Sequence, residues 1–264
     1  MKSLITRILA AAFLVLFLYS GWHLCQIFIE YRTADAQYDK LGEYVSAPGG
    51  SLSDSTPAAE EKSECPQVDF DALSKINPET VGWLIIEDTG INYPVVQGAD
   101  NEFYLKHQFD GRYNSSGCLF LDVKNDASFQ EFNQIIYGHY MNNQSMFSDL
   151  VKYKDQEFFD AHPAGWLVTP SAAYRLQFFS GYVSDVLGDA WDTEFSAADY
   201  PQWLRKCQEQ SIFTADTVPD AEDRVLTLST CSYEFPNARF VLHAVLQTQC
   251  PDAAGIDSVP TDNR

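Results

Sequence analysis

The chain has little positive charge for its size. Its 264 residues contain 17 Lys and Arg against 37 Asp and Glu, which gives a formal net charge of -20 at pH 7. A field of that sign repels phosphate backbones, so the composition argues against nucleic acid as a partner. An acidic surface mainly favours solubility, although it can also attract a basic or amine-bearing substrate.

Cysteine is also scarce, and no C-x-x-C pair occurs in the chain. The low density argues against a disulfide-stabilised scaffold, and the missing pair argues against a zinc site. Cys25 lies in a long apolar run, and Cys231 is a candidate nucleophile. The remaining four are Cys65, Cys118, Cys207 and Cys250. They can pair in three ways or stay reduced, and the sequence does not choose among these states.

Only one apolar run is long enough to cross a membrane. Residues 8–29 contain no Asp, Glu, Lys or Arg, and 22 residues suffice to span hydrocarbon as a helix. The densest part, residues 8–18, is also typical of the core of a cleavable signal peptide, but no small-x-small cleavage pattern closes it. We therefore predict an uncleaved transmembrane signal anchor over 8–29.

The charges beside this run give its orientation. Lys2, Arg7 and the free amine favour a cytoplasmic N-terminus over residues 1–7, whereas Arg32 and Lys40 weaken that bias from the other side. We expect a single-pass protein of the cell membrane whose remaining residues are extracytoplasmic.

The segment after the span divides into two parts. Near-helical spacing continues through Tyr31, Ala34, Tyr38 and Leu41. The following residues 42–64 are rich in Gly, Pro, Ser and acid and lack apolar periodicity, which is typical of flexible chain. We assign residues 30–64 to an extracytoplasmic tether, 65–249 to one folded domain, and 250–264 to a flexible C-terminal tail.

Within the folded domain, short apolar segments are separated by Gly, Pro, Asn and Asp. This pattern predicts a mainly β protein, a barrel or sandwich, with strands over 83–86, 93–96, 118–122, 134–137, 174–183, 225–230 and 239–246. Two helices are expected, one over 70–76 and one around Trp203. In the second, an apolar stripe at helical spacing indicates core packing: Tyr200, Trp203, Leu204 and Cys207.

Three residues at predicted strand ends have the chemistry of a cysteine enzyme. Cys231 ends the run VLTLSTC, and Arg239 opens the next strand eight residues later. If the two strands pair antiparallel, the guanidinium returns to the sulfur and can face a thiolate or a developing oxyanion. His139 follows another strand, in QIIYGHYMNN, where an exposed imidazole can transfer protons.

Each of these residues could also serve a purely structural role. A lone cysteine after a strand is commonly a small buried apolar residue, and a lone arginine commonly solvates a strand edge. The three together become specific only if their strand ends meet, which the spacing permits. The other histidines fit structural positions better: His243 inside a strand, and His107 and His162 in a loop or at a helix end.

The TLSTC segment with Cys231, the following strand with Arg239 and the YGHYM segment with His139 resemble the signature of sortases, the cysteine transpeptidases of Gram-positive cell surfaces. The run from Ile76 to Asp122, INPETVGWLIIEDTGINYPVVQGADNEFYLKHQFDGRYNSSGCLFLD, is similar to the N-terminal half of class B sortases. The similarity covers about residues 70–246. It implies an eight-stranded sortase-type β-barrel with a few short helices.

This resemblance implies a reaction and its partners. Cys231 would attack a Thr-Gly-type bond in the C-terminal sorting signal of a surface protein and form a thioester. An amine acceptor, a peptidoglycan precursor or a pilin lysine, would resolve it without metal or organic cofactor. His139 would transfer protons and Arg239 would hold the carbonyl or oxyanion. By the same resemblance, the groove for the sorting signal would be lined by Ser229, Asn101 and Leu105.

Two features depart from the class B pattern, and two other functions stay open. The interval from Cys231 to Arg239 is short, and Ser232 stands where an acidic residue often follows the cysteine. A cysteine peptidase would resolve the same thioester with water. A membrane-tethered binding module could keep the fold without turnover, although the intact trio argues against it.

Overall fold

The computed structural model describes residues 2–46 and 65–250. The part of the predicted tether from 47 to 64 and the predicted tail from 251 onward lie outside the described residues.

Eight strands form a closed barrel in the order β10-β8-β7-β3-β4-β5-β6-β9, which confirms the predicted fold class. In chain order the strands are β3 (Thr80–Ile85), β4 (Asn92–Val96), β5 (Leu119–Leu121), β6 (Asn133–Tyr137), β7 (Ala164–Val168), β8 (Ala173–Asp185), β9 (Val225–Cys231) and β10 (Ala238–Cys250). Neighbouring strands are antiparallel except for the pairs β4–β5 and β6–β9, which are parallel. Those two parallel pairs need long crossover connections.

Strand β7 was not predicted from the sequence. Its five residues, AGWLV, follow a proline and include alanine and glycine, which are weak strand formers. Gly165 is needed there because a Cβ atom would lie 2.8 Å from the carbonyl oxygen of Ile85 on the neighbouring strand. The close approach of the two backbones therefore requires glycine at position 165. Because glycine has no side chain, it adds nothing to the apolar pattern from which the other strands were predicted.

Short helices cover the barrel. α2 (Phe70–Ile76) matches the predicted helix and is capped by Asp69, whose side chain accepts a hydrogen bond from the backbone N–H of Ala72 at 2.8 Å. The remaining short elements are β1 (Val45–Ser46), β2 (Gln67–Val68), α3 (Gln156–Ala161), α4 (Tyr200–Gln210) and the 3₁₀ turns η1 (Gly42–Tyr44), η2 (Phe103–Leu105), η3 (Ser148–Lys154) and η4 (Asp189–Trp191).

The predicted apolar stripe of α4 is buried in a second, smaller core outside the barrel, against residues that include Phe179, Tyr182 and Val241. His243 on β10 is fully buried beside this core, and burial lowers its pKa to about 3, so the ring is neutral. Its packed position agrees with the structural role expected from the sequence.

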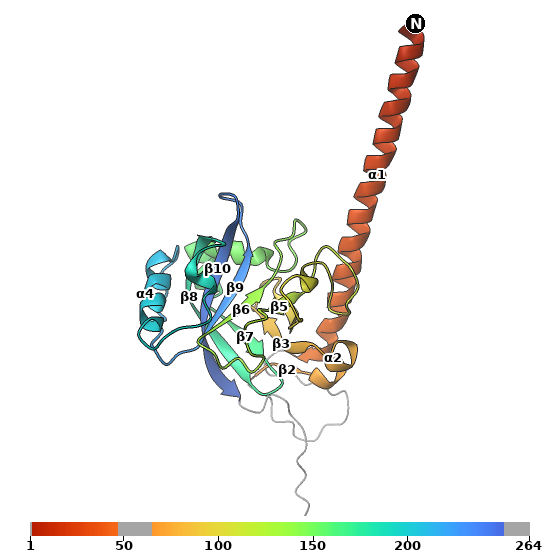
Figure 1. Cartoon of the computed structure of the whole chain (residues 1–264). Coiled ribbons are helices and arrows are strands. Elements are labelled where there is room, and N and C mark those ends of the chain that lie inside the picture. The colour runs from red at the N-terminus through yellow and green to blue at the C-terminus, as the bar shows by residue number, and fades with distance from the viewer. Residues whose placement is uncertain (1, 47–64, 251–264) are drawn as a thin grey trace, which may run out of the picture.

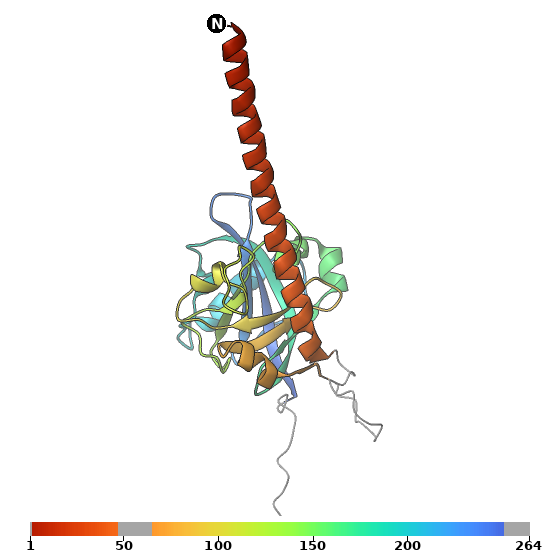
Figure 2. The ribbon, with the colours of Figure 1, turned by 90° about the vertical axis from the view of Figure 1, so that its right-hand side faces the viewer.

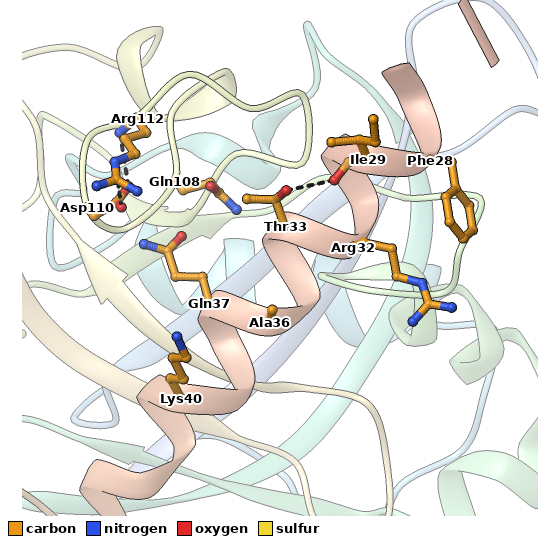
Figure 3. Close-up of a pocket in the computed structure, with 10 residues that line it drawn as sticks. All are labelled: Phe28, Ile29, Arg32, Thr33, Ala36, Gln37, Lys40, Gln108, Asp110 and Arg112. Atoms are coloured by element: carbon orange, nitrogen blue, oxygen red, sulfur yellow. Dashed lines mark hydrogen bonds and ion pairs between the residues drawn. The ribbon is translucent and has the colours of Figure 1, made fainter. Parts of the chain in front are cut away.

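One N-terminal helix, α1 (Lys2–Leu41), projects far beyond the barrel as a single rod (Figures 1 and 2). In the described part of the chain it is the one helix long and apolar enough to cross a membrane, with a mean hydropathy of 1.7 in its apolar window. Figures 1 and 2 also show the loop between β9 and β10 directed toward the same side as the N-terminus of α1.

The lower part of α1 packs against the barrel, although the sequence places it in the tether. Ala34, Tyr38 and Leu41 are buried in the main core. The hydroxyl of Tyr38 donates a 2.6 Å hydrogen bond to the carbonyl of Gly117. The residues at near-helical spacing in the sequence therefore form the face of α1 that contacts the barrel. The Tyr38 hydrogen bond joins this face to the loop before β5.

A disulfide joins Cys65 to Cys250, at the two ends of the folded domain. Cys118 and Cys207 are buried thiols. Of the possibilities left open by the sequence, the structure therefore has one bridge and two reduced cysteines. Strand β10 runs to Cys250, one residue past the predicted domain end at 249.

Candidate active site

Cys231 and Arg239 lie on the neighbouring strands β9 and β10, and His139 lies two residues past the end of β6, the other neighbour of β9. Cys231, the last residue of β9, is paired directly with Arg239 on β10. Directly opposed residues of an antiparallel pair have side chains on the same face, with Cβ atoms about 5 Å apart. On the other side, β6 runs parallel to β9 with Tyr137 opposite Ser229, and the N–H of Gly138 donates to the Ser229 carbonyl at 3.1 Å. Cys231 therefore occupies the middle strand.

A cleft of about 470 Å³ opens at these strand ends. All six residues predicted from the sequence as catalytic or substrate-binding line it: Asn101, Leu105, His139, Ser229, Cys231 and Arg239. Cys231, His139 and Arg239 are each partly exposed. The thiol, the imidazole and the guanidinium can therefore meet one ligand in one place.

His139 is held by the backbone of η2. Its Nε2 lies 2.7 Å from the carbonyl oxygen of Leu105, and because a carbonyl only accepts, Nε2 carries the proton of this bond. In the neutral ring this leaves Nδ1 as the nitrogen that can take up a proton. The contact fixes the orientation of the ring.

Two glycines make room for this arrangement. A Cβ atom on Gly138 would lie 2.5 Å from Leu119 and 2.6 Å from Phe147, both fully buried. Gly117 has a positive φ of 61°, and a Cβ there would lie 2.5 Å from the carbonyl oxygen of Tyr104 and 3.2 Å from the ring of His139. The same Gly117 receives the hydrogen bond from Tyr38, so α1 supports the loop behind the histidine.

Arg239 makes one hydrogen bond, from Nη1 to the carbonyl of Ala238 at 3.0 Å, and no ion pair within the described residues. A guanidinium has five N–H donors, so most of them stay available to a ligand. A positive charge beside the cysteine favours both a thiolate and an anionic oxygen.

The side chains predicted to line a substrate groove are held by polar contacts. Asn101 donates from Nδ2 to the Asp122 carboxylate at 3.1 Å and accepts from the N–H of Val123 at 2.9 Å. The hydroxyl of Tyr137 donates to the same Asp122 carboxylate at 2.8 Å. Burial and this carboxylate raise the pKa of Tyr137, so its hydroxyl stays protonated. These contacts hold one wall of the cleft in a fixed shape.

Sequence reasoning missed several cleft residues, above all Trp191 on η4. Its Nε1 donates to the hydroxyl of Ser229 at 3.2 Å, so the indole covers the strand that leads to Cys231. Phe120, Tyr137 and Val186 also line the cleft. The available signal was a single tryptophan in a segment with three acidic residues, LGDAWDTEF, because binding residues often lie on loops.

A buried polar chain supports the turn that carries Trp191. Asn133 on β6 donates to the carbonyl of Asp192 at 2.9 Å and accepts from the hydroxyl of Thr227 at 2.7 Å. Thr227 in turn lies 2.9 Å from Nδ1 of His243. Asn133, Thr227 and His243 are fully buried, so the position of η4 is coupled to the barrel strands.

Ser232 stands where class B sortases often have an acidic residue, and here an acidic residue, Glu234, lies two positions later. The Ser232 hydroxyl donates to the Glu234 carboxylate at 2.5 Å and accepts from Lys154 Nζ at 2.9 Å. Glu234 also forms an ion pair with Lys154 of η3. These two partners, Lys154 first, lower the pKa of Glu234 to about 2. The acidic group is therefore ionised and ties the β9–β10 loop to η3.

No protein-family model matches the chain. Sortase B of Listeria monocytogenes is 32% identical over 251 residues, which cover 94% of this chain and 99% of that protein. A Staphylococcus aureus sortase B–substrate complex superimposes with a TM-score of 0.65 at 32% identity, over 68% of this chain and 84% of the other. A sortase B crystal structure complexed with triglycine has a TM-score of 0.65 at 33% identity, over 68% and 85%. The chain belongs to the sortase B family.

Proposed function

We propose that this sortase-type enzyme cleaves the C-terminal sorting signal of surface proteins and transfers them to an amine. The observation that carries the proposal is the cleft shared by Cys231 on β9, Arg239 on β10 and His139 just after β6, the other neighbour of β9. A thiol nucleophile needs a proton-transfer partner and a group that stabilises the oxyanion, and these side chains supply both.

In the first half-reaction, the Cys231 thiol proton passes to Nδ1 of His139 and the thiolate attacks the scissile carbonyl, while Arg239 donates hydrogen bonds to the oxygen that becomes negative. Nδ1 of His139 gives this proton to the leaving amine, and a thioester remains on the sulfur. In the second half-reaction, an incoming amine attacks the thioester and His139 takes up its proton. The new amide leaves and Cys231 is regenerated.

Ser229, Asn101 and Leu105 contact the sorting signal in this proposal. Leu105 is partly exposed and offers apolar surface, while the fixed Asn101 amide has an N–H that makes no contact with Asp122. The S. aureus substrate complex and the triglycine complex named above support a peptide substrate and an amine acceptor for this family. We expect the acceptor here to be a peptidoglycan precursor or a pilin.

We further propose that α1 anchors the enzyme in the cell membrane through residues 8–29, with the barrel outside. The loop between β9 and β10, which follows Cys231, is directed toward the side from which α1 would enter the bilayer (Figure 1). Substrates attached to the same membrane would then approach the cleft from its open end.

The products of the reaction test this function. Full-length enzyme in detergent is mixed with peptides carrying candidate sorting signals, together with amine acceptors such as triglycine, and the products are weighed by mass spectrometry. We expect a product joined to the acceptor. If hydrolysed peptide alone forms with every acceptor, the enzyme is a peptidase, and if no peptide is cleaved while the fold is intact, the barrel acts as a binding module.

Gly138→Ala tests the placement of His139. Its Cβ would overlap with two fully buried side chains, so we expect a loss of about 1–3 kcal/mol in stability and a fall of about 100-fold in kcat/KM from displacement of the imidazole. Thermal unfolding and peptide kinetics measure the two effects. Gly42→Ala, which meets no atom within 4 Å, serves as the control. Wild-type kinetics in Gly138→Ala would contradict the assigned position of His139.

A further inference from the structure

Exposed apolar side chains gather at the end of the barrel that holds the catalytic cleft. The loop between β9 and β10 carries Tyr233 and Phe235, which are 74% and 42% exposed, and the turn after β8 carries Leu187, which is 92% exposed. The two connections are neighbours, because Asp185 at the end of β8 is paired with Ala238 at the start of β10. We refer to Leu187, Tyr233 and Phe235 as the apolar rim. The proposed reaction uses none of them.

The backbone of the β9–β10 loop is closed by two hydrogen bonds. The N–H of Ser232 donates to the Ala238 carbonyl at 3.0 Å, and the N–H of Ala238 donates to the Phe235 carbonyl at 3.1 Å. The ring of Tyr233 packs edge to face with that of Tyr140, with the ring centroids 5.5 Å apart. The fold therefore holds Tyr233 and Phe235 at the surface. Neighbouring exposed apolar side chains of this kind mark contact with a protein or a membrane.

The charge of this loop is compensated, although the chain has a net charge of -20. Glu234 is the one charged residue among positions 232–237, and its carboxylate forms an ion pair with Lys154 of η3. The Ser232 hydroxyl donates to the same carboxylate at 2.5 Å. An unpaired charge would oppose contact with an apolar phase, and these six fully described residues contain none.

Helix α1 fixes the height of the barrel relative to the proposed membrane span. The span ends at Ile29, and the next residue, Glu30, already contacts the barrel domain. Asn114 donates to the Glu30 carbonyl at 3.0 Å, and the Ser115 hydroxyl donates to the Glu30 carboxylate at 2.7 Å. Because α1 is one continuous helix over Lys2–Leu41, these contacts hold the domain at the edge of the hydrocarbon.

The end of the barrel that meets this edge is the catalytic one. A Cβ on Gly117, two residues after Ser115, would lie 3.2 Å from the ring of His139, so the contact with α1 is close to the cleft. Figures 1 and 2, which differ by a quarter turn about the vertical axis, both show the β9–β10 loop rising further along α1 than the other loops of the barrel. The loop therefore passes the level of Glu30 and reaches that of the apolar span.

We propose that the apolar rim docks on the outer leaflet of the membrane, with Tyr233 and Phe235 in the interfacial layer and Leu187 beside them. Aromatic rings favour this layer, and burial of apolar surface drives the contact, so no particular headgroup is required. A lipid surface is favoured over a protein partner because α1 itself brings the rim to the bilayer. The proposal rests on the proposed membrane anchor.

This contact would set the distance between the cleft and the membrane. Cys231 directly precedes the loop, and three residues, half of the loop, span at most about 10 Å when extended. The thiol would therefore lie within about 10 Å of the docked rings, and the cleft would meet substrates whose scissile bond is close to the bilayer.

Photolabelling of the full-length protein tests the contact. The protein is reconstituted in nanodiscs of phosphatidylcholine, a minor share of which carries a diazirine near the glycerol end of one acyl chain. After irradiation, the labelled residues are identified by tandem mass spectrometry. We expect label on residues 232–237 and on Leu187, in addition to label on the span over residues 8–29.

Val218 is the matched internal control. It is 74% exposed, like Tyr233, but it lies in the connection before β9, whose opposite end carries Cys231. We expect no label there. Label on Val218 equal to that on the rim would show that the reagent reacts with any exposed apolar side chain, and the proposal would be wrong.

Variants of the rim provide a second measurement. Tyr233→Ser combined with Phe235→Ser should lower the label on the rest of the loop by about fivefold or more, because each ring contributes several-fold through its buried apolar area. Ile212→Ser with Val218→Ser should leave it unchanged. Leu187→Ser alone changes a side chain that is 92% exposed, so a loss of label on its turn cannot come from misfolding.

The label on the span separates failure of the rim from failure of the anchor. Label on residues 8–29 without label on the rim would overturn the proposal and keep the anchor, as expected if a protein surface covers the rim instead. A chain without label in either place would reject both. Undiminished label in the double rim variant would also contradict the proposal. Peptide transfer in detergent, measured separately, tests the enzymatic function without a bilayer.

Discussion

Cys231→Ala should abolish peptide cleavage and amine transfer while the protein stays folded. Loss of the nucleophile in an enzyme that forms a covalent intermediate lowers kcat by about 10⁴-fold or more. The side chain is partly exposed at the end of β9, so its removal leaves little cavity and should cost less than about 1 kcal/mol. Mass spectrometry after mixing with a sorting-signal peptide should show an acyl adduct on the wild type and none on the variant.

The control for this variant is another cysteine. Cys207→Ala removes a buried thiol on the inner face of α4, in the second core and outside the cleft. It should keep turnover even if it lowers the unfolding temperature. Measurable transfer by Cys231→Ala at rates near those of the wild type would end the assignment of Cys231 as nucleophile.

Arg239→Lys should lower kcat/KM by about 10²–10³-fold, which is the usual effect of losing an oxyanion donor. The ammonium keeps the charge but not the planar fork of donors, and its shorter reach from β10 gives different geometry. We expect the loss mainly in kcat, because the contact forms as negative charge develops on the oxygen. Steady-state kinetics with the peptide and a saturating amine would measure both constants.

Arg175→Lys is the matched control, because Arg175 lies on β8 and pairs with Glu87 at 2.9 Å, outside the cleft. It should have wild-type kinetics. If Arg239→Lys matched it, the guanidinium would contribute only a nearby positive charge, and the proposed contact with the oxyanion would be wrong.

The strands and the three candidate catalytic residues were largely predictable from local patterns, whereas the eight-stranded barrel and the groove residues Ser229, Asn101 and Leu105 were predicted from the resemblance to class B sortases. Alternating and β-branched runs marked seven of the eight barrel strands, and the ends of β6, β9 and β10 indicated His139, Cys231 and Arg239. The pairing of β9 with β10 follows from a short connection. The pairing of β6 with β9 does not, because the two strands are parallel and 87 residues lie between Tyr137 and Val225.

Other features depend on contacts between distant segments and leave no periodic signal. Trp191 contacts Ser229 from η4, and the end of that turn is bonded to the buried Asn133 of a distant strand. The choice of Cys250 as partner of Cys65 depends on where β10 ends beside the start of the domain. Gly165 and Gly138 serve close approaches that can be recognised only once the neighbouring strands are placed.

The distribution of the cysteines has a consequence for an enzyme whose barrel is proposed to lie outside the membrane, in an oxidising compartment. Burial raises the pKa of Cys118 and of Cys207 to about 12, so neither forms the thiolate that oxidants and disulfides attack. Cys250 and Arg239 are eleven residues apart on β10, about 37 Å along an extended strand. Once the barrel has closed, the Cys65–Cys250 bridge at its base therefore lies too far from Cys231 to exchange with it.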